Sequence, residues 1–390
     1  MSEKVEEQIR LLLAGLNLND DTYIAHAIQH ETGGAKGINA TTDTSYVPIC
    51  QKTVTYIVAA VIINDQNEVL MMQEAKASCS GKWYLPAGRV ERNENLLDAV
   101  KREVLEETGL IMEPKTLILM ECASGSWFRF VFMGDVCGGN IKTSDQANEE
   151  SLQARWVHNV EDLPLRCKDI IPLIERGKNY IKGKPGSQHP YLMPLSRPLS
   201  KLLLQLIITA KKRATNTLHV VISDAELLHL PICEINPNRN LLSTLHNFMT
   251  EIFGTDVAPH KPHGLLSVEF SGNHDGDGLC LSLLVSFKLP VEEVPIIGKY
   301  SWYQVSENIA EGITTRLPRN MTVPLNVVQT YEITILVNLY THVRQRITYI
   351  ILFIRNFANV VFNINKYFIK KKCFARIYSQ LTKNIYSYLQ

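Results

Sequence analysis

The amino-acid sequence predicts an α/β fold in which helices flank a mixed β-sheet, followed by a second C-terminal α/β module. Residues 54–63 are β-branched and almost continuously apolar, which is typical of a buried strand. Residues 96–108 contain neither Gly nor Pro and precede Gly109, which is typical of a helix and its C-terminal end. Strand-like and helix-like segments follow no strict alternation, and this favours a mixed sheet over a parallel one.

The N-terminal part divides into a leader and a first module. Residues 1–50 combine helix-like apolar spacing over 5–16 with a Gly-, Thr- and Asp-rich stretch at 32–45 that indicates a linker. The first module, residues 51–183, begins with the apolar strand. Further strands are predicted at 68–73, 117–121, 127–133 and 154–157, and a closing helix at 169–182.

A domain boundary is predicted where prolines and glycines accumulate, at residues 184–198. Residues 199–326 form a C-terminal α/β module of unknown role, long enough to bury a core of its own. Within it, helices are predicted at 202–210 and 241–253, and strands at 218–222, 265–270 and 279–287. No internal sequence repeat is evident.

The segment 327–390 differs in composition from the rest of the chain. It lacks Gly, Pro, Asp, Met and Trp, and it carries nine Lys and Arg residues against the single acid Glu332. This basic, aromatic composition favours translated non-coding sequence over a selected domain. The alternative is a membrane span, but Arg344, Arg346 and Arg355 interrupt the apolar stretch before it reaches about 18 uncharged residues.

Composition excludes several classes of protein. Hydrophobic residues make up 45% and charged residues 20%, which excludes disorder as the main state. The net charge of +1 gives no basic field for polymeric nucleic acid. The eight cysteines form no CxxC pair, which argues against zinc. The absence of a signal-peptide pattern in residues 1–17 predicts a cytoplasmic location, with the nucleus as the alternative.

The stretch from Gly88 to Leu110, GRVERNENLLDAVKREVLEETGL, carries the chemistry. At about 100° per residue, Glu103, Glu106 and Glu107 fall within a ~100° arc of one helix face. Like charges at this spacing are destabilising by themselves, but they suit a hard divalent cation such as Mg²⁺ or Mn²⁺. The alternative is a solvated acidic face, with Arg102 and Glu106 as an ordinary surface pair.

The same stretch resembles the Nudix box, GX5EX7REUXEEXGU, at every defined position. The resemblance implies a Nudix α/β/α sandwich around a mixed sheet. It also implies metal-dependent hydrolysis of nucleoside diphosphate derivatives with Mg²⁺ or Mn²⁺ as cofactor. The residues it assigns to metal binding and catalysis are Gly88 through its carbonyl, Glu103, Glu106 and Glu107 as ligands, Arg102 as their orienting partner and Glu94 as a supporting group. A further acid beyond the box is expected at Glu150, which could instead be a surface loop residue.

The flanking segments 73–76, 81–88, 126–132 and 150–156 resemble Nudix members that remove oxidised guanine nucleotides. This resemblance implies cleavage of 8-oxo-dGDP and 8-oxo-GDP to the monophosphate and phosphate. The alternatives are cleavage of ADP-ribose, of dinucleoside polyphosphates or of another nucleoside diphosphate derivative such as coenzyme A, or a non-catalytic nucleotide-binding role. A small nucleotide is the expected partner, with no nucleic acid polymer and no membrane, and protein partners are not indicated.

Six residues are candidates for binding the nucleotide. Leu70 and Val90 match positions expected to line the pocket, and the other four are Trp83, Tyr84, Phe128 and Asp169. Trp83 and Phe128 could instead be core residues. Asp169 could instead cap the helix that follows it.

Overall fold

A computed structural model describes residues 2–16, 46–184, 186–224, 228–270, 272 and 276–328. These residues belong to one compact unit, 1–328. The predictions for 17–45 and for the basic tail from 329 onward lie outside the described residues. In the part of the chain that the structure describes, no helix is long and apolar enough to cross a membrane.

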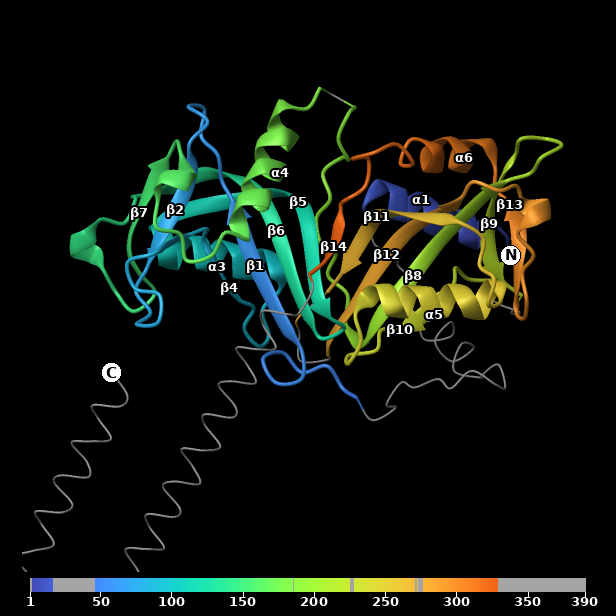
Figure 1. The fold of residues 1–390 in the computed structure, drawn as a ribbon, viewed down its shortest axis with the longest axis horizontal. Coiled ribbons are helices and arrows are strands. Elements are labelled where there is room, and N and C mark those ends of the chain that lie inside the picture. The colour runs from blue at the N-terminus through green and yellow to red at the C-terminus, as the bar shows by residue number, and fades with distance from the viewer. Residues whose placement is uncertain are drawn as a thin grey trace, which may run out of the picture. The chain divides into compact units, whose positions relative to one another are not determined.

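The predicted mixed sheet has its strands in the order β14-β5-β6-β1-β4, with β14 contributed by the second module and the other four by the first (Figure 1). β1 runs parallel to β6, and β14 runs parallel to β5, whereas β4 is antiparallel to β1 and β5 is antiparallel to β6. β2, β3 and β7 form a separate three-stranded antiparallel sheet. The bounds are β1 (Thr55–Val61), β2 (Val69–Glu74), β3 (Trp83–Tyr84), β4 (Ala87–Arg89), α3 (Leu96–Thr108), β5 (Leu110–Ser124), β6 (Trp127–Gly139), η1 (Ser144–Gln146), β7 (Ser151–Val157), η2 (Val160–Asp162) and α4 (Ile170–Lys182).

The second module contains a six-stranded sheet, with β11-β12-β8-β9-β13 in line and β10 paired to β8. One face packs against α5, and the other packs against α6 and the N-terminal helix α1. The bounds are α1 (Ser2–Ala14), β8 (Leu199–Lys211), β9 (Leu218–Ser223), β10 (Ile232–Glu234), α5 (Leu241–Phe253), β11 (His260–Glu269), β12 (Asp277–Phe287), η3 (Val291–Glu293), β13 (Tyr300–Gln304), α6 (Glu307–Thr314) and β14 (Leu325–Val327).

The helix predicted at 202–210 is wrong, because these residues lie in strand β8. The strand is buried on both faces: Leu204 and Leu206 pack in the core beneath α5, and Ile207 packs against α1 and α6. A continuous apolar run has the same appearance in a buried helix and in a strand covered on both sides. The helices predicted at 96–108 and 241–253 are confirmed as α3 and α5.

The two modules share a hydrophobic core. Tyr56 in β1 contacts the ring of Phe270 with centroids 4.8 Å apart, and its hydroxyl donates to the Asp277 carbonyl at 2.6 Å. The carboxylate of Asp277 in turn accepts from the Cys50 N–H at 2.7 Å. These contacts hold the sheet of the second module against the strands that carry the Nudix-like box.

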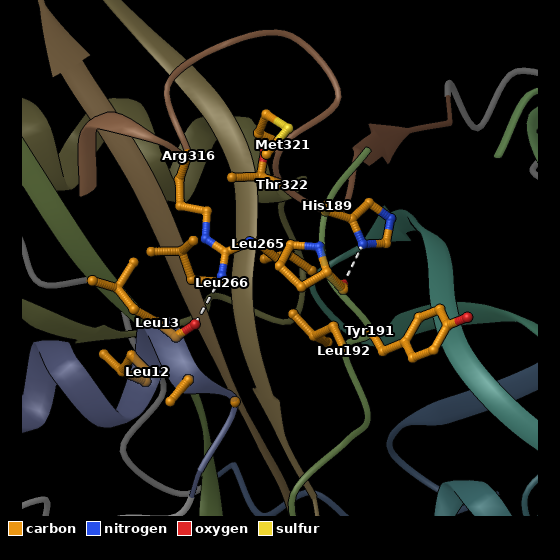
Figure 2. A pocket seen from close by; sticks show the side chains of 13 residues that line it. Leu12, Leu13, His189, Tyr191, Leu192, Leu265, Leu266, Arg316, Met321 and Thr322 are labelled. Carbon is orange, nitrogen blue, oxygen red and sulfur yellow. Dashed lines mark hydrogen bonds between the residues drawn. The ribbon is translucent and has the colours of Figure 1, made fainter. Parts of the chain in front are cut away.

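Helix α1 belongs structurally to the second module. Its apolar face, including Val5 and Ile9, is fully buried against β8, β9 and α6. Figure 2 shows the small pocket at its C-terminal end, where the Arg316 guanidinium donates to the Leu13 carbonyl at 2.8 Å beside Leu265. Because carbonyls at a helix C-terminus lack partners within the helix, Arg316 stabilises this end of α1.

Candidate active site

Helix α3 positions the carboxylates, and both of its ends are defined by the sequence. At its N-terminus the Asn95 side chain accepts hydrogen bonds from the Leu97 and Asp98 N–H groups, each at 2.9 Å. At its C-terminus Gly109 adopts a left-handed conformation with φ of 74° and donates to the Leu105 carbonyl. Such a C-cap favours glycine because a side chain is strained at positive φ.

Strand β4 brings Gly88 directly against the carboxylate of Glu103. A Cβ atom at position 88 would lie 2.1 Å from the Glu103 carboxyl carbon, so no other residue fits here without displacing that side chain. Gly88 is fixed in place by its register with Val58 of β1. The glycine of the box is therefore required by the close approach of strand and carboxylate.

Arg102 connects three acidic residues around this point. It binds both oxygens of Glu94, from Nε at 2.7 Å and from Nη2 at 2.9 Å. Its Nη1 donates to Glu103 at 2.9 Å and to Glu106 at 3.1 Å. Nη2 also reaches the Arg89 carbonyl at 3.0 Å. A planar guanidinium with this many fixed donors holds the carboxylates in defined orientations.

Glu107 is almost completely buried, with 2% of its surface exposed. Its Oε2 accepts a hydrogen bond from the Ala87 N–H at 2.8 Å. Burial raises the pKa of Glu107 well above its ordinary value, and the charges of Glu103 and Glu74 raise it further against the opposing Ala87 hydrogen bond. An acidic group is thus held beneath β4, where desolvation disfavours its charge.

Burial also raises the pKa of Glu103, although the neighbouring Arg102 opposes the shift. The charges of Glu106 and Glu150 add to the increase, so both carboxylates lie close enough to act on Glu103. Glu150 is partly exposed and directly precedes β7, and Glu106 is exposed. The structure therefore brings the predicted Glu150 to the same side of the molecule as the box.

Two side chains from outside the helix bind the last carbonyls of α3. Lys142 Nζ donates to the Glu106 carbonyl at 2.5 Å and to Ser151 Oγ at 2.8 Å. Ser151 Oγ donates to the Glu107 carbonyl at 2.7 Å. The helix has no basic residue in its own last turn, so Lys142 supplies the favourable positive charge there.

This set of residues fits a hard divalent cation. The available ligands are carboxylate oxygens, and Gly88 leaves the room in which the Glu103 carboxylate is seated. Within the described residues no three His, Cys, Asp or Glu side chains are already gathered into a metal-binding group. Mg²⁺ is commonly bound by one or two carboxylates together with water and substrate phosphates, so a complete protein cage is not required.

A second polar cluster lies around Arg129 on β6. Its guanidinium donates to Glu121 from Nε at 2.6 Å, and from Nη1 to the Tyr84 hydroxyl at 2.9 Å and to Asp169 at 2.7 Å. Tyr84 also donates to Asp169 at 2.9 Å. Burial alone would raise the pKa of Asp169, but the hydrogen bonds and charge of Arg129 outweigh it and lower the pKa.

Asp169 does not cap helix α4, which was the alternative to a binding role. It stands at the N-cap position, but its side chain makes no capping hydrogen bond. One carboxylate oxygen binds Arg129 and Tyr84, and the other, Oδ1, is buried and has no hydrogen-bond partner in the structure. A buried acceptor in this state is costly unless a ligand or water satisfies it.

The structure does not bring the other nucleotide-binding candidates into one place. Leu70, Val90 and Phe128 are fully buried in the core shared with the second module. Trp83 lies in the separate core between the two sheets of the first module, where the Arg155 guanidinium stacks 4.3 Å from its ring. For these four residues a role in binding stays a prediction.

Sequence reasoning missed Trp127, the neighbour of Phe128. In a strand successive side chains point to opposite faces, so Trp127 shares its face with Arg129 and Phe128 does not. The Arg129 guanidinium lies 5.9 Å from the centre of the Trp127 ring. The period-two pattern of the strand was the available signal, but it does not say which face carries the site.

Glu74 and Arg166 were also missed, and they connect the two polar clusters. Arg166 donates to Glu74 at 2.5 Å, and its guanidinium lies 4.8 Å from the centre of the Tyr84 ring. Glu74 is buried, its other oxygen has no partner, and its charge acts on Glu107. Glu74 and Arg166 therefore lie between Glu107 and the cluster around Arg129.

Comparisons with known proteins identify the family of this chain. Residues 54–173 match the NUDIX domain model. The human protein named 8-oxo-dGDP phosphatase NUDT18 is 36% identical over 299 residues, which cover 71% of this chain and 88% of the human one. The zebrafish protein of that name is 35% identical, covering 66% and 82%. Putative nudix hydrolase 1 of Caenorhabditis elegans is 39% identical, covering 41% and 45%. The chain, whose complete box runs from β4 through α3 to the start of β5, therefore belongs to the Nudix hydrolase family.

Proposed function

We propose that this enzyme hydrolyses 8-oxo-dGDP and 8-oxo-GDP to the monophosphate and phosphate, with Mg²⁺ or Mn²⁺ as cofactor. The observation that carries the proposal is the arrangement of the box carboxylates: Glu103 and Glu106 bind Arg102, and Glu107 binds the Ala87 N–H beside Gly88. It occurs in a chain that aligns with most of a protein named for 8-oxo-dGDP hydrolysis. The reaction removes oxidised guanine from the nucleotide pool.

The carboxylates of α3, together with the Gly88 carbonyl and Glu150, would hold the metal. Such an ion neutralises phosphate charge and lowers the pKa of bound water. Arg102 orients the carboxylates, and Glu94 fixes Arg102 through two hydrogen bonds. Removing this support should loosen the metal site, because partners of metal ligands typically contribute 10- to 100-fold to affinity or activity.

The cluster around Arg129 would recognise the base. Asp169 Oδ1 is a buried acceptor without a partner and can accept an N–H from the edge of an oxidised purine. Trp127 offers an aromatic ring on the same face of β6. Arg166 lies between this cluster and Glu74 and supplies a positive charge there.

The first experiment is a substrate comparison with the full chain. 8-oxo-dGDP, dGDP, 8-oxo-dGTP and ADP-ribose are incubated with Mg²⁺ or Mn²⁺, and products are separated by chromatography. We expect preferential conversion of 8-oxo-dGDP to 8-oxo-dGMP. Asp169→Asn should lower this preference over dGDP by roughly 10-fold, because one charged hydrogen bond to the base is worth about 1.5–3 kcal/mol.

Other outcomes would replace the proposal. Conversion of ADP-ribose to AMP, without cleavage of 8-oxo-dGDP, would keep the family chemistry and change the substrate. Tight nucleotide binding without metal-dependent cleavage would indicate a binding module. We place the activity in the cytoplasm, where thiols stay reduced, and the described cysteines form no disulfide.

A further inference from the structure

The sheet of the second module repeats the strand order and directions of the first. In the first, β5-β6-β1-β4 lie side by side, with β6 and β1 parallel and the other pairs antiparallel. In the second, β11-β12-β8-β10 lie side by side, with β12 and β8 parallel and the other pairs antiparallel. In both modules the parallel pair joins the first long strand of the module, β1 or β8, to the strand that follows the hairpin partner, β6 or β12.

The remaining elements also correspond in order. β2 pairs antiparallel with β7, as β9 does with β13. Helix α3 follows β4 and helix α5 follows β10, and the last helices of the two modules are α4 and α6 (Figure 1). Both α3 and α5 have 13 residues, with Asn at the N-cap and Gly at the C-cap. β3 has no counterpart among the described strands of the second module, and β9 and β13 join the main sheet where β2 and β7 form a separate one. The shared strand order, strand directions and helix ends still indicate two copies of one fold.

This correspondence identifies which residues of the second module occupy the positions of the box. Gly88 lies eight residues before the first residue of α3, and Cys233 lies eight before the first residue of α5. Counted along the helices, Phe248 stands where Glu103 stands and Ile252 where Glu107 stands. Both are buried apolar residues of the core. The second copy therefore lacks the ligands of a metal site.

The two copies meet through equivalent strands. β14 pairs in parallel with β5, with Asn326 opposite Glu121. Just before it, Val323 exchanges both backbone hydrogen bonds with Leu265 of β11, at 2.8 and 3.1 Å. Figure 1 shows β14 between β5 and β11. The last strand of the second module thus covers the β5 edge of the mixed sheet of the first module.

This strand places a polar side chain beside the base cluster. Residues in register on neighbouring strands share a face, so Asn326, Glu121 and Arg129 form one row across β14, β5 and β6. Asn326 is exposed. Its amide offers donors and an acceptor, whereas Asp169 at the other side of Arg129 only accepts. The edge of an oxidised guanine presents both carbonyl oxygens and N–H groups.

We propose that residues 199–327 are a metal-free second copy of the catalytic fold, and that this copy completes the substrate pocket of the first by adding β14, from which the Asn326 amide binds the nucleoside. The proposal rests on the proposed function for the identity of the substrate. It gives the second module a direct part in substrate binding.

The test compares steady-state kinetics of the full chain and its variants. Asn326→Ala should raise KM for 8-oxo-dGDP by about 10-fold with kcat within 2-fold, the effect of losing one or two hydrogen bonds. Val328→Pro removes the Val328 N–H bond to the Cys122 carbonyl, 2.8 Å long, and should raise KM in the same direction. Asn247→Ala, an exposed Asn on α5, is the matched control and should change neither constant.

An unchanged KM in Asn326→Ala, with the melting temperature of the wild type, would overturn the contact. If the wild-type enzyme cleaves another nucleotide in place of 8-oxo-dGDP, the proposed function fails, while KM for the cleaved nucleotide still tests Asn326. Mn²⁺ binding followed by electron paramagnetic resonance tests the metal-free copy. The double variant Glu103→Gln, Glu107→Gln should lose the wild-type sites, and a remaining site of wild-type affinity would overturn that part.

Discussion

Helices α3 and α5 have the same length and the same kinds of ends, but their buried faces differ. In α3 the carboxylates of Glu103 and Glu107 are directed into the fold, and burial raises the pKa of both. In α5 the corresponding positions hold Phe248 and Ile252, which pack in the core. One scaffold therefore carries an acidic site in one copy and ordinary apolar packing in the other, which shows that the chemistry resides in the side chains and not in the fold.

The difference also concerns stability. Phe248 and Ile252 stabilise the second copy by removing apolar surface from water. Glu103 and Glu107 oppose folding when they are charged, because burial disfavours their charge. The first copy accepts this cost at the site where a metal is expected, and stability and activity should therefore respond in opposite directions to mutation.

The largest difference between the copies should appear in activity. Glu107→Gln should lower kcat/KM by more than about 100-fold, because even the outer partners of metal ligands contribute 10- to 100-fold. Glu251→Gln, at the position in α5 that corresponds to Glu106, should leave kcat/KM within 2-fold. Initial rates of phosphate release measure both. A comparable loss in the two variants would contradict the assignment of catalysis to the first copy.

The next effect is on the stability of the second copy. Ile252→Glu buries a carboxylate without a partner and should lower the free energy of unfolding by about 3–5 kcal/mol. Leu242→Glu introduces the same group at an exposed position of the same helix and should change it by less than about 0.5 kcal/mol. Urea unfolding of both variants checks this. Equal stabilities would mean that the buried face of α5 is not as closely packed as the structure shows.

A smaller effect is expected in how the free energy of unfolding of the metal-free protein depends on pH. Because the folded pKa of Glu107 is raised, its contribution to stability is fully present below about pH 4.3 and is lost as pH rises through the folded pKa. Glu107→Gln removes this loss, so the variant should become more stable than the wild type as pH rises from 5 to 8, by roughly 0.5–2 kcal/mol. Glu113→Gln, at an exposed pair with Lys101, is the control. If the difference in stability between Glu107→Gln and the wild type does not grow with pH, the raised pKa of Glu107 is contradicted.

The box and helices could be predicted because they depend on local sequence. The spacing of the carboxylates and the Gly109 cap lie within one helix and its ends. The run at 202–210 was misassigned because burial on both faces of β8 removes the alternation that normally marks a strand.

The rest of the site depends on contacts between distant segments. Arg129 and Asp169 meet although 40 residues separate them, and Asn326 reaches the row of Glu121 through a strand about 200 residues further along. No local pattern contains such pairings. The repeated fold left no sequence signal because the residues that mark the box are replaced by core residues such as Phe248, and only the strand order retains the relationship.

The smallest expected effect separates the ends of the two helices. Lys142 binds the last turn of α3 through the Glu106 carbonyl and Ser151, and it is nearly buried. Lys142→Met should lower the free energy of unfolding by about 1–2 kcal/mol, because it removes these two hydrogen bonds and a third to Asn148 Oδ1, and leaves the Glu106 carbonyl without this donor. Lys101→Met removes an exposed ion pair with Glu113 and should change it by less than about 0.5 kcal/mol. Thermal unfolding measures both. If Lys142→Met also lowers kcat several-fold while Lys101→Met does not, the end of α3 sets the positions of Glu106 and Glu107, whereas an unchanged kcat would limit Lys142 to stability.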